Sequence, residues 1–188
     1  MQANSSDKID NPTQSCYFTW VPPRIGCVKL NIDGNWSNIS GAIAAGGVVR
    51  NHDRQWIKGF VMNKGKGSIL EAELWAVFEG LKMAWDGGFR KVQIDSDCLE
   101  AISLIQRGCN VNNPLWYLIQ ECRRLIDSPW CCELSHIYRE SNFLADAMAA
   151  FGQSLSCGIP FFEEPPPFVF SVFAKDADGI AYARELVV

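Results

Sequence analysis

Acidic side chains stand at four separate places in the chain, each beside an apolar segment that could hold it rigidly. Asp33 ends the alternating stretch Val28–Ile32 and precedes a glycine. The other candidate acids are Glu71, Glu73, Asp95, Asp97 and Asp146. Carboxylate oxygens are the ligands that a hard cation such as Mg²⁺ selects. No histidine pair or C-x-x-C spacing, which would suit a softer metal, stands beside these acids. The pattern therefore predicts a divalent-cation site, provided that the fold brings these acids together.

Two of these places offer a choice between neighbouring acids. Glu71 and Glu73 are two residues apart on a predicted helix, so only one of them can point into a shared site. Asp95 and Asp97 alternate across a predicted strand end, where such residues share a face, and spacing alone leaves both open. Each acid also has a plain structural role available. Asp33 can form a turn, and Asp97 can cap the helix that follows it.

The elements that must position these acids follow from hydrophobic periodicity and from the residues that start and stop helices. The sequence predicts that Ser68 is a helix N-cap with Glu71 as its capping-box partner, and that Gly87-Gly88 ends that helix. The predicted strands are 27–33, 42–50, 55–62, 91–95 and 130–138, and the predicted helices are 68–86, 97–107, 114–126 and 142–151. This order indicates an α/β fold with a five-stranded mixed sheet, three antiparallel N-terminal strands and flanking helices.

The length and composition bound the rest of the chain. Its 188 residues suffice for one domain, expected at 20–152, with a flexible segment at 1–19 and an extension at 153–188. The extension has a proline-rich break at 163–167, followed by the apolar stretch 168–173, which reads as an edge strand or a docking segment for a partner or for the domain itself.

Charge and cysteine usage constrain the setting. A net charge of −4 argues against a general electrostatic grip on nucleic acid, so any such contact must be local or metal-bridged. The eight cysteines, without C-x-x-C spacing, and the polar start indicate a reducing intracellular compartment, nuclear or cytoplasmic, with no membrane association. We expect a monomer.

Five phrases in order resemble the ribonuclease H-like superfamily, and more closely the plant domains related to the terminal domain of non-LTR retroelement polyproteins. These phrases are 29–34, 46–50, 72–76, 95–97 and 139–146, so the resemblance covers about 20–152. It implies the ribonuclease H-like fold and cleavage of the RNA strand of RNA–DNA hybrids with two Mg²⁺ ions, or Mn²⁺. It also implies that the catalytic and metal-binding acids are Asp33, Glu73, Asp97 and Asp146, which leaves Glu71 as a cap and Asp95 as a neighbour.

The resemblance also leaves points open. Candidate substrate contacts are Asn35, Ser37, Arg139 and Asn142, with Asn38 and Arg50 as further polar groups. His136 is either a counterpart of the family's mobile histidine or an ordinary strand residue. The short connection 108–113 has no room for the basic, tryptophan-rich protrusion of some family members. A second hypothesis is therefore a retroelement-derived binding or interaction module with little or no turnover.

Overall fold

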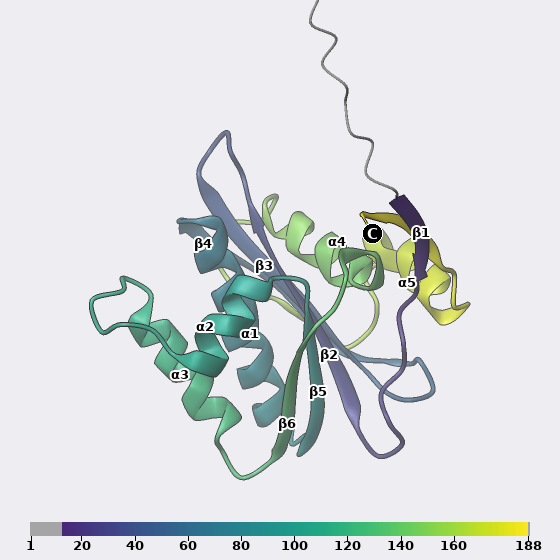
Figure 1. Cartoon of the computed structure of the whole chain (residues 1–188), viewed down its shortest axis with the longest axis horizontal. Coiled ribbons are helices and arrows are strands. Elements are labelled where there is room, and N and C mark those ends of the chain that lie inside the picture. Colours follow the sequence, from purple (N-terminus) through teal and green to yellow (C-terminus); the bar gives the residue numbers. More distant parts are fainter. Residues whose placement is uncertain (1–12, 188) are drawn as a thin grey trace, which may run out of the picture.

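The computed structural model describes residues 13–187 and consists of a mixed sheet with helices on both faces (Figure 1). The strands are β1 (Thr13–Phe18), β2 (Val28–Trp36), β3 (Ala42–Arg50), β4 (Trp56–Lys66), β5 (Lys91–Ser96), β6 (Cys131–His136), β7 (Phe161–Phe162) and β8 (Tyr182–Val187). The helices are α1 (Ile69–Asp86), α2 (Leu99–Arg107), α3 (Trp116–Ile126), α4 (Phe143–Gly152) and α5 (Phe170–Ala177), with short 3₁₀ turns η1 (Arg139–Ser141) and η2 (Pro167–Val169).

The main sheet has the strand order β6-β5-β2-β3-β4-β7. β2, β3 and β4 form the expected antiparallel meander, whereas β5 runs parallel to β2, and β6 runs parallel to β5. All five predicted strands are present, and the two-residue β7 adds a sixth at the edge beside β4. Such a short strand within a proline-rich segment carries no alternation that sequence periodicity could detect.

The helices are divided between the two faces of the sheet. α1, α2 and α3 pack against one face and contribute to the larger apolar core, in which Leu30 and Ile32 of β2 are fully buried. α4 covers the other face, where Val48 and Met148 belong to a second apolar cluster (Figure 1). Because both faces are covered, β3 is buried over almost its whole length, which explains its continuous small and apolar sequence.

The ends of the described chain depart from the sequence-based expectations. The segment 13–18, expected to be flexible, forms β1 and pairs antiparallel with β8, while residues 1–12 lie outside the described part. The stretch 168–173 is not an edge strand, because it enters η2 and α5 after three prolines. Val169 is fully buried in the second apolar cluster, so this stretch packs on the domain itself.

Two smaller features also bear on the site. The helix expected from Asp97 begins at Leu99, and its N-cap is Cys98, whose Sγ accepts from the Ala101 N–H at 3.5 Å. Asp97 is therefore not the N-cap.

Within the described residues, no helix is both long enough and apolar enough to cross a bilayer.

Candidate active site

Three of the predicted acids converge at one edge of the sheet. Carboxylate oxygens of Asp33, Glu73 and Asp97 all lie within 4.8 Å of one another. Asp33 lies on β2 and Asp97 just follows β5, and these strands are adjacent and parallel, so residues near their carboxyl ends meet at the same edge. Glu73 comes from the first turns of α1, which packs on β2. We call these three residues the acid cluster.

Close packing of α1 on β2 places Glu73. The backbone N–H of Gly34 donates to Oε2 of Glu73 at 3.1 Å. A Cβ atom at position 34 would lie 2.4 Å from the backbone nitrogen of Glu73, so any larger residue would push the helix away. The glycine after Asp33 is therefore required for the approach between strand and helix that forms the acid cluster.

The structure separates the two ambiguous pairs of acids. Glu71 lies outside the cluster, and its backbone N–H donates to Oγ of Ser68 at 3.1 Å, which confirms Ser68 as the N-cap. The return bond of a capping box, from the Ser68 N–H to the Glu71 side chain, is not among the hydrogen bonds of the described residues. Asp95 is also outside, because its Oδ2 forms a nearly buried ion pair of 2.7 Å with Nζ of Lys29. Glu73 and Asp97 are thus the members of each pair that face Asp33.

The fourth predicted acid does not join the other three. Asp146 lies in the first turn of α4, and its Oδ2 is 3.2 Å from Nη2 of Arg139. It is still close enough for its charge to contribute to the raised pKa values of Asp33 and Glu73. The largely exposed side chain of Arg139 thus forms an ion pair with the carboxylate of Asp146 in this arrangement.

Burial and mutual repulsion make the acid cluster costly to ionise. Burial raises the pKa of Asp33 well above its ordinary value, and the charges of Glu73, Asp97 and Asp146 raise it further. Burial and the charge of Asp97 raise the pKa of Glu73 to about 8, against the opposing effect of the Gly34 N–H. A bound cation would favour the ionised carboxylates and release their protons, so this all-oxygen, under-compensated group fits a hard divalent ion.

The predicted polar contacts fall into two groups. Asn35 and Ser37 lie at the end of β2, partly exposed, and Asn35 accepts a hydrogen bond from Nε2 of Gln153 through its side chain. In contrast, Asn142 and Arg50 are each only 1% exposed. Neither can reach a ligand on the surface, so the expectations that Arg50 contacts a nucleic-acid backbone and that Asn142 contacts substrate are wrong. Asn142 instead donates through Nδ2 to Oδ1 of Asp97 at 3.3 Å.

Residues 31–152 match the family described as reverse transcriptase-like. This matched range includes the whole acid cluster and Asp146. The chain belongs to this reverse transcriptase-like family, within the ribonuclease H-like superfamily.

A relative of this family member is the Arabidopsis thaliana protein named "Putative ribonuclease H protein At1g65750". It is 33% identical over 178 residues, which is 95% of the present chain. The chain spans only 29% of the length of that relative.

Solved structures support the fold of the reverse transcriptase-like domain. RNase H1 from Halobacterium salinarum has a TM-score of 0.63 at 24% identity, covering 69% of this chain and 98% of its own. The N-terminal RNase H domain of a Mycobacterium tuberculosis protein has a TM-score of 0.62 at 21% identity, covering 68% and 94%. LC11-RNase H1, in complex with an RNA/DNA hybrid, has a TM-score of 0.61 at 18% identity, covering 69% and 99%.

A surface hollow adjoins the acid cluster of this reverse transcriptase-like domain. It has a volume of about 260 Å³ and is lined by Ile69, Leu70, Glu73, Asp97, Cys98 and Glu100. Burial and the charge of Glu73 raise the pKa of the Cys98 thiol to about 11, which disfavours the thiolate near neutral pH. His136 is exposed on β6 with its ring edge-on to Tyr138, 6.0 Å between centroids. The acids are thus the groups that the structure gathers at this place, and His136 lies on the strand beside them, paired with Ser96.

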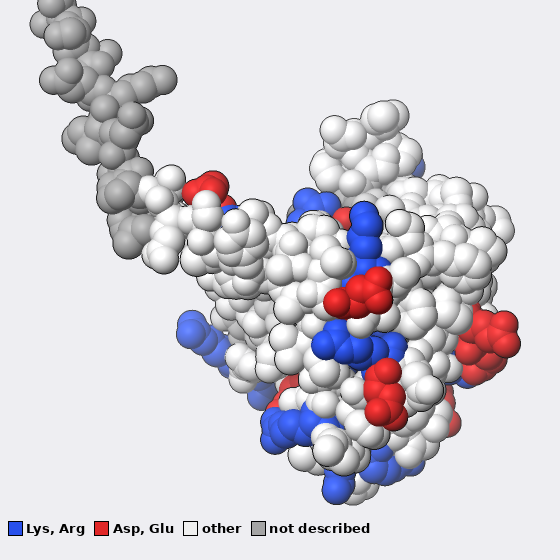
Figure 2. Space-filling model, turned by 90° about the vertical axis from the view of Figure 1, so that its right-hand side faces the viewer, with Lys and Arg blue, Asp and Glu red and all other residues white. Residues whose placement is uncertain are grey.

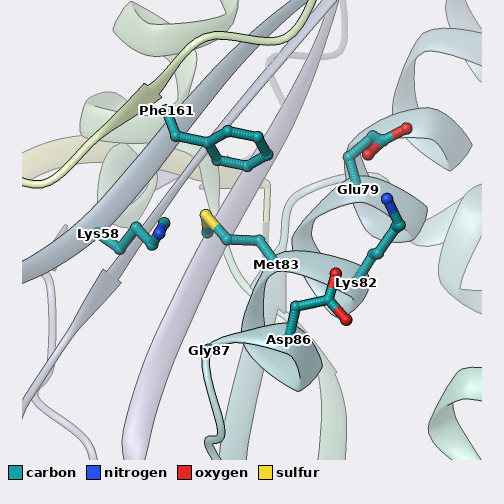
Figure 3. A pocket seen from close by; sticks show the side chains of 7 residues that line it. All are labelled: Lys58, Glu79, Lys82, Met83, Asp86, Gly87 and Phe161. Atoms are coloured by element: carbon teal, nitrogen blue, oxygen red, sulfur yellow. The ribbon is translucent and has the colours of Figure 1, made fainter.

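A second hollow of about 210 Å³ lies near the other end of α1 (Figure 3). Lys82 and Asp86 of the helix and Lys58 and Phe161 of the facing strands line it. Burial raises the pKa of Glu79 there, while Lys82 and Lys64 oppose that effect. The hollow shares no lining residue with the acid cluster, and we assign it no role in the chemistry.

Proposed function

We propose that this chain is a metal-dependent endonuclease that hydrolyses the RNA strand of RNA–DNA hybrids. The observation that carries the proposal is the convergence of oxygens of Asp33, Glu73 and Asp97 within 4.8 Å, in a member of the reverse transcriptase-like family. Carboxylates gathered at this density suit phosphodiester hydrolysis assisted by divalent ions.

Asp33, Glu73, Asp97 and Asp146 together would hold two Mg²⁺ ions, with Mn²⁺ as a substitute. When bound, these ions supply charge neutralisation and Lewis-acid activation at a phosphodiester. The protein's own contribution is to hold the ligands in place. The Gly34 N–H orients the carboxylate of Glu73, and the amide of Asn142 orients that of Asp97.

Substrate contacts in this proposal are local. The exposed guanidinium of Arg139 beside Asp146 meets a backbone phosphate next to the scissile bond. Asn35 and Ser37 are close in sequence to Asp33 and carry the amide and hydroxyl groups that can hydrogen-bond a ribose 2′-hydroxyl. The buried amide of Asn142 acts through Asp97 instead of touching substrate.

The choice of a hybrid substrate is supported by the structural relative LC11-RNase H1, whose structure is of a complex with an RNA/DNA hybrid. The net charge of −4 favours a substrate held at few points over non-specific binding along a duplex. Figure 2 agrees with this on one face of the molecule, where basic and acidic side chains are interspersed and form no continuous basic field.

A second candidate is a binding or interaction module derived from a retroelement, with little turnover. It is favoured by the engagement of Asp146 with Arg139 and by the connection 108–115, which contains no lysine or arginine that could grip a duplex. Only the first candidate requires a phosphodiester to break, whereas the module requires at most binding.

A panel of labelled substrates separates the two candidates. RNA–DNA hybrid, double-stranded RNA and double-stranded DNA of one sequence are incubated with the purified protein in Mg²⁺, in Mn²⁺ and in EDTA. The proposal expects cleavage of the RNA strand of the hybrid alone, with divalent ion alone, giving 3′-hydroxyl and 5′-phosphate ends. Binding of the hybrid without cleavage in either metal would favour the module.

A further inference from the structure

The part of the chain beyond the matched family region reaches back to the acid cluster through a buried polar chain. We infer that Asp176, on α5, is a positioning residue for the metal site, acting through Arg50, Asn31 and Asn142. This inference rests on the proposed function in that it concerns the acids assigned there. Asp176 lies outside the family match at 31–152 and does not belong to the acid cluster.

The first step of the polar chain is a buried ion pair. Nη1 of Arg50 lies 2.7 Å from Oδ2 of Asp176, and the two side chains are 1% and 3% exposed. The guanidinium also stacks on the ring of Trp20, with 3.7 Å between Cζ and the ring centroid. Its Nε has no hydrogen-bond partner in the described structure. Asp176 and the Trp20 ring therefore hold the orientation of Arg50, and Asp176 supplies the countercharge.

The second step fixes the orientation of an amide. Oδ1 of Asn31 accepts from Nη2 of Arg50 at 2.9 Å and from Nε1 of Trp20 at 2.7 Å. Because two donors meet this oxygen, the Nδ2 group must point the other way, where it donates to Oδ1 of Asn142 at 3.2 Å. The orientation of the first amide thus dictates that of the second.

The third step reaches the acid cluster. With its oxygen facing Asn31, the Nδ2 group of Asn142 donates to the backbone oxygen of Ile32 at 2.9 Å and to Oδ1 of Asp97 at 3.3 Å. A reversed amide at Asn142 would present an oxygen to the Asp97 carboxylate, and two acceptors would repel each other. Arg50, together with Trp20 and the Ile32 backbone oxygen, therefore favours the amide orientation in which Asp97 receives a hydrogen bond and not a repulsive contact.

The extension also supports the loop that carries Asn142. Nη1 of Arg184, on β8, is 3.1 Å from Oε2 of Glu140, and its guanidinium lies over the ring of Tyr138. The rings of Phe143 and Tyr182 meet edge to face at 4.7 Å between centroids. β8 thus contacts the loop that carries Asn142, while Asp176 of α5 acts through the buried polar chain. Both C-terminal elements therefore support the acid cluster in this proposal.

The test compares Asp176→Asn with Asp178→Asn, a matched change on an exposed residue two positions along. The first readout is the side-chain amide NMR signals of Asn31 and Asn142 in metal-free protein. The second is Mn²⁺ affinity, measured by electron paramagnetic resonance. We expect Asp176→Asn to move both amide signals and to weaken Mn²⁺ binding about tenfold, as loss of a supporting hydrogen bond commonly does. Asp178→Asn should change neither.

The inference is overturned if Asp176→Asn only lowers the unfolding midpoint, with amide signals and Mn²⁺ affinity equal to those of Asp178→Asn. If Asp176→Asn does not fold, the double variant Arg50→Met/Asp176→Leu removes both buried charges together, a change that proteins often tolerate. It should show the same two effects, and wild-type behaviour would again overturn the inference. The NMR readout needs neither metal nor substrate, so it separates this inference from a failure of the proposed function.

Discussion

The N–H of Gly34 donates a 3.1 Å hydrogen bond to the carboxylate of Glu73, so the residue next to one acid of the cluster holds another. This contact requires β2 and α1 to approach more closely than any side chain at position 34 would allow. The turn glycine that follows Asp33 is therefore a requirement of the site as well as of the fold.

Gly34→Ala should separate α1 from β2 and displace Glu73. We expect a loss of stability of about 1–3 kcal/mol from overpacking, together with weaker Mn²⁺ binding. The control is Gly88→Ala, at the far end of α1, where an added Cβ meets nothing but the backbone φ of +79° is unfavourable. Both variants should unfold earlier in thermal scans. Equal Mn²⁺ affinity for the two would contradict the role assigned to Gly34.

Asp33→Asn should stabilise the metal-free protein. Burial and three neighbouring acids raise the pKa of Asp33, so the ionised residue is unfavourable in the folded state near neutral pH, and an amide removes that cost. Thermal unfolding in EDTA at neutral pH measures the effect, and excess Mn²⁺ should shift the midpoint less than in wild type. A lower midpoint for the variant in EDTA would contradict this account of the electrostatics.

The metal-free protein should become less stable as the pH rises from about 4.5 to about 8. Across this range Glu73 keeps a proton in the folded state, with its pKa at about 8, whereas the unfolded chain, near the ordinary value of 4.5, has lost it. Because the folded state binds more protons, raising the pH favours unfolding. Denaturant unfolding of Glu73→Gln in EDTA should show a shallower pH dependence. An unchanged slope would mean that Glu73 does not hold the extra proton.

Arg139→Gln should affect substrate binding more than stability. The ion pair with Asp146 involves a guanidinium that is 64% exposed, and such pairs contribute about 1 kcal/mol or less. If Arg139 meets a phosphate, hybrid affinity should fall and the slope of log K against log salt should decrease by about one. Fluorescence anisotropy at several salt concentrations measures both quantities. A large drop in stability with unchanged hybrid affinity would give Arg139 a structural role instead.

Local sequence patterns predicted only part of the acid cluster, namely the positions that strand alternation and helix capping determine. Asp33 follows from strand alternation that ends in a turn glycine, and Ser68 correctly located the start of α1. The choice of Glu73 over Glu71 needed the family resemblance, because helical spacing showed only that one of them faces the site. The ion pair of Asp95 with Lys29 then explains why Asp97 alone remains for the cluster.

Contacts between residues far apart in the chain could not be predicted in this way. Arg50 was interpreted as a surface cation because its partner, Asp176, lies 126 residues away, in an extension for which the sequence predicted no role for that residue. Asn142 likewise was interpreted as a loop amide, since its side-chain partners are distant in the chain: Asn31 and Ile32 of β2, and Asp97 just after β5. The strand β1 was missed because its stabilising partner, β8, is at the other end of the chain.

The most direct test of the central claim is cleavage of a labelled RNA–DNA hybrid by the purified chain in Mg²⁺ or Mn²⁺, beside Asp33→Asn. Metal-assisted hydrolysis relies on several kcal/mol of stabilisation, at about 1.4 kcal/mol for each factor of ten. We therefore predict RNA-strand cleavage by the wild-type chain and a loss of about 10³-fold or more in the variant. Equal cleavage by the two proteins, or none by the wild type in either metal, would contradict the assignment of the acid cluster as a nuclease centre.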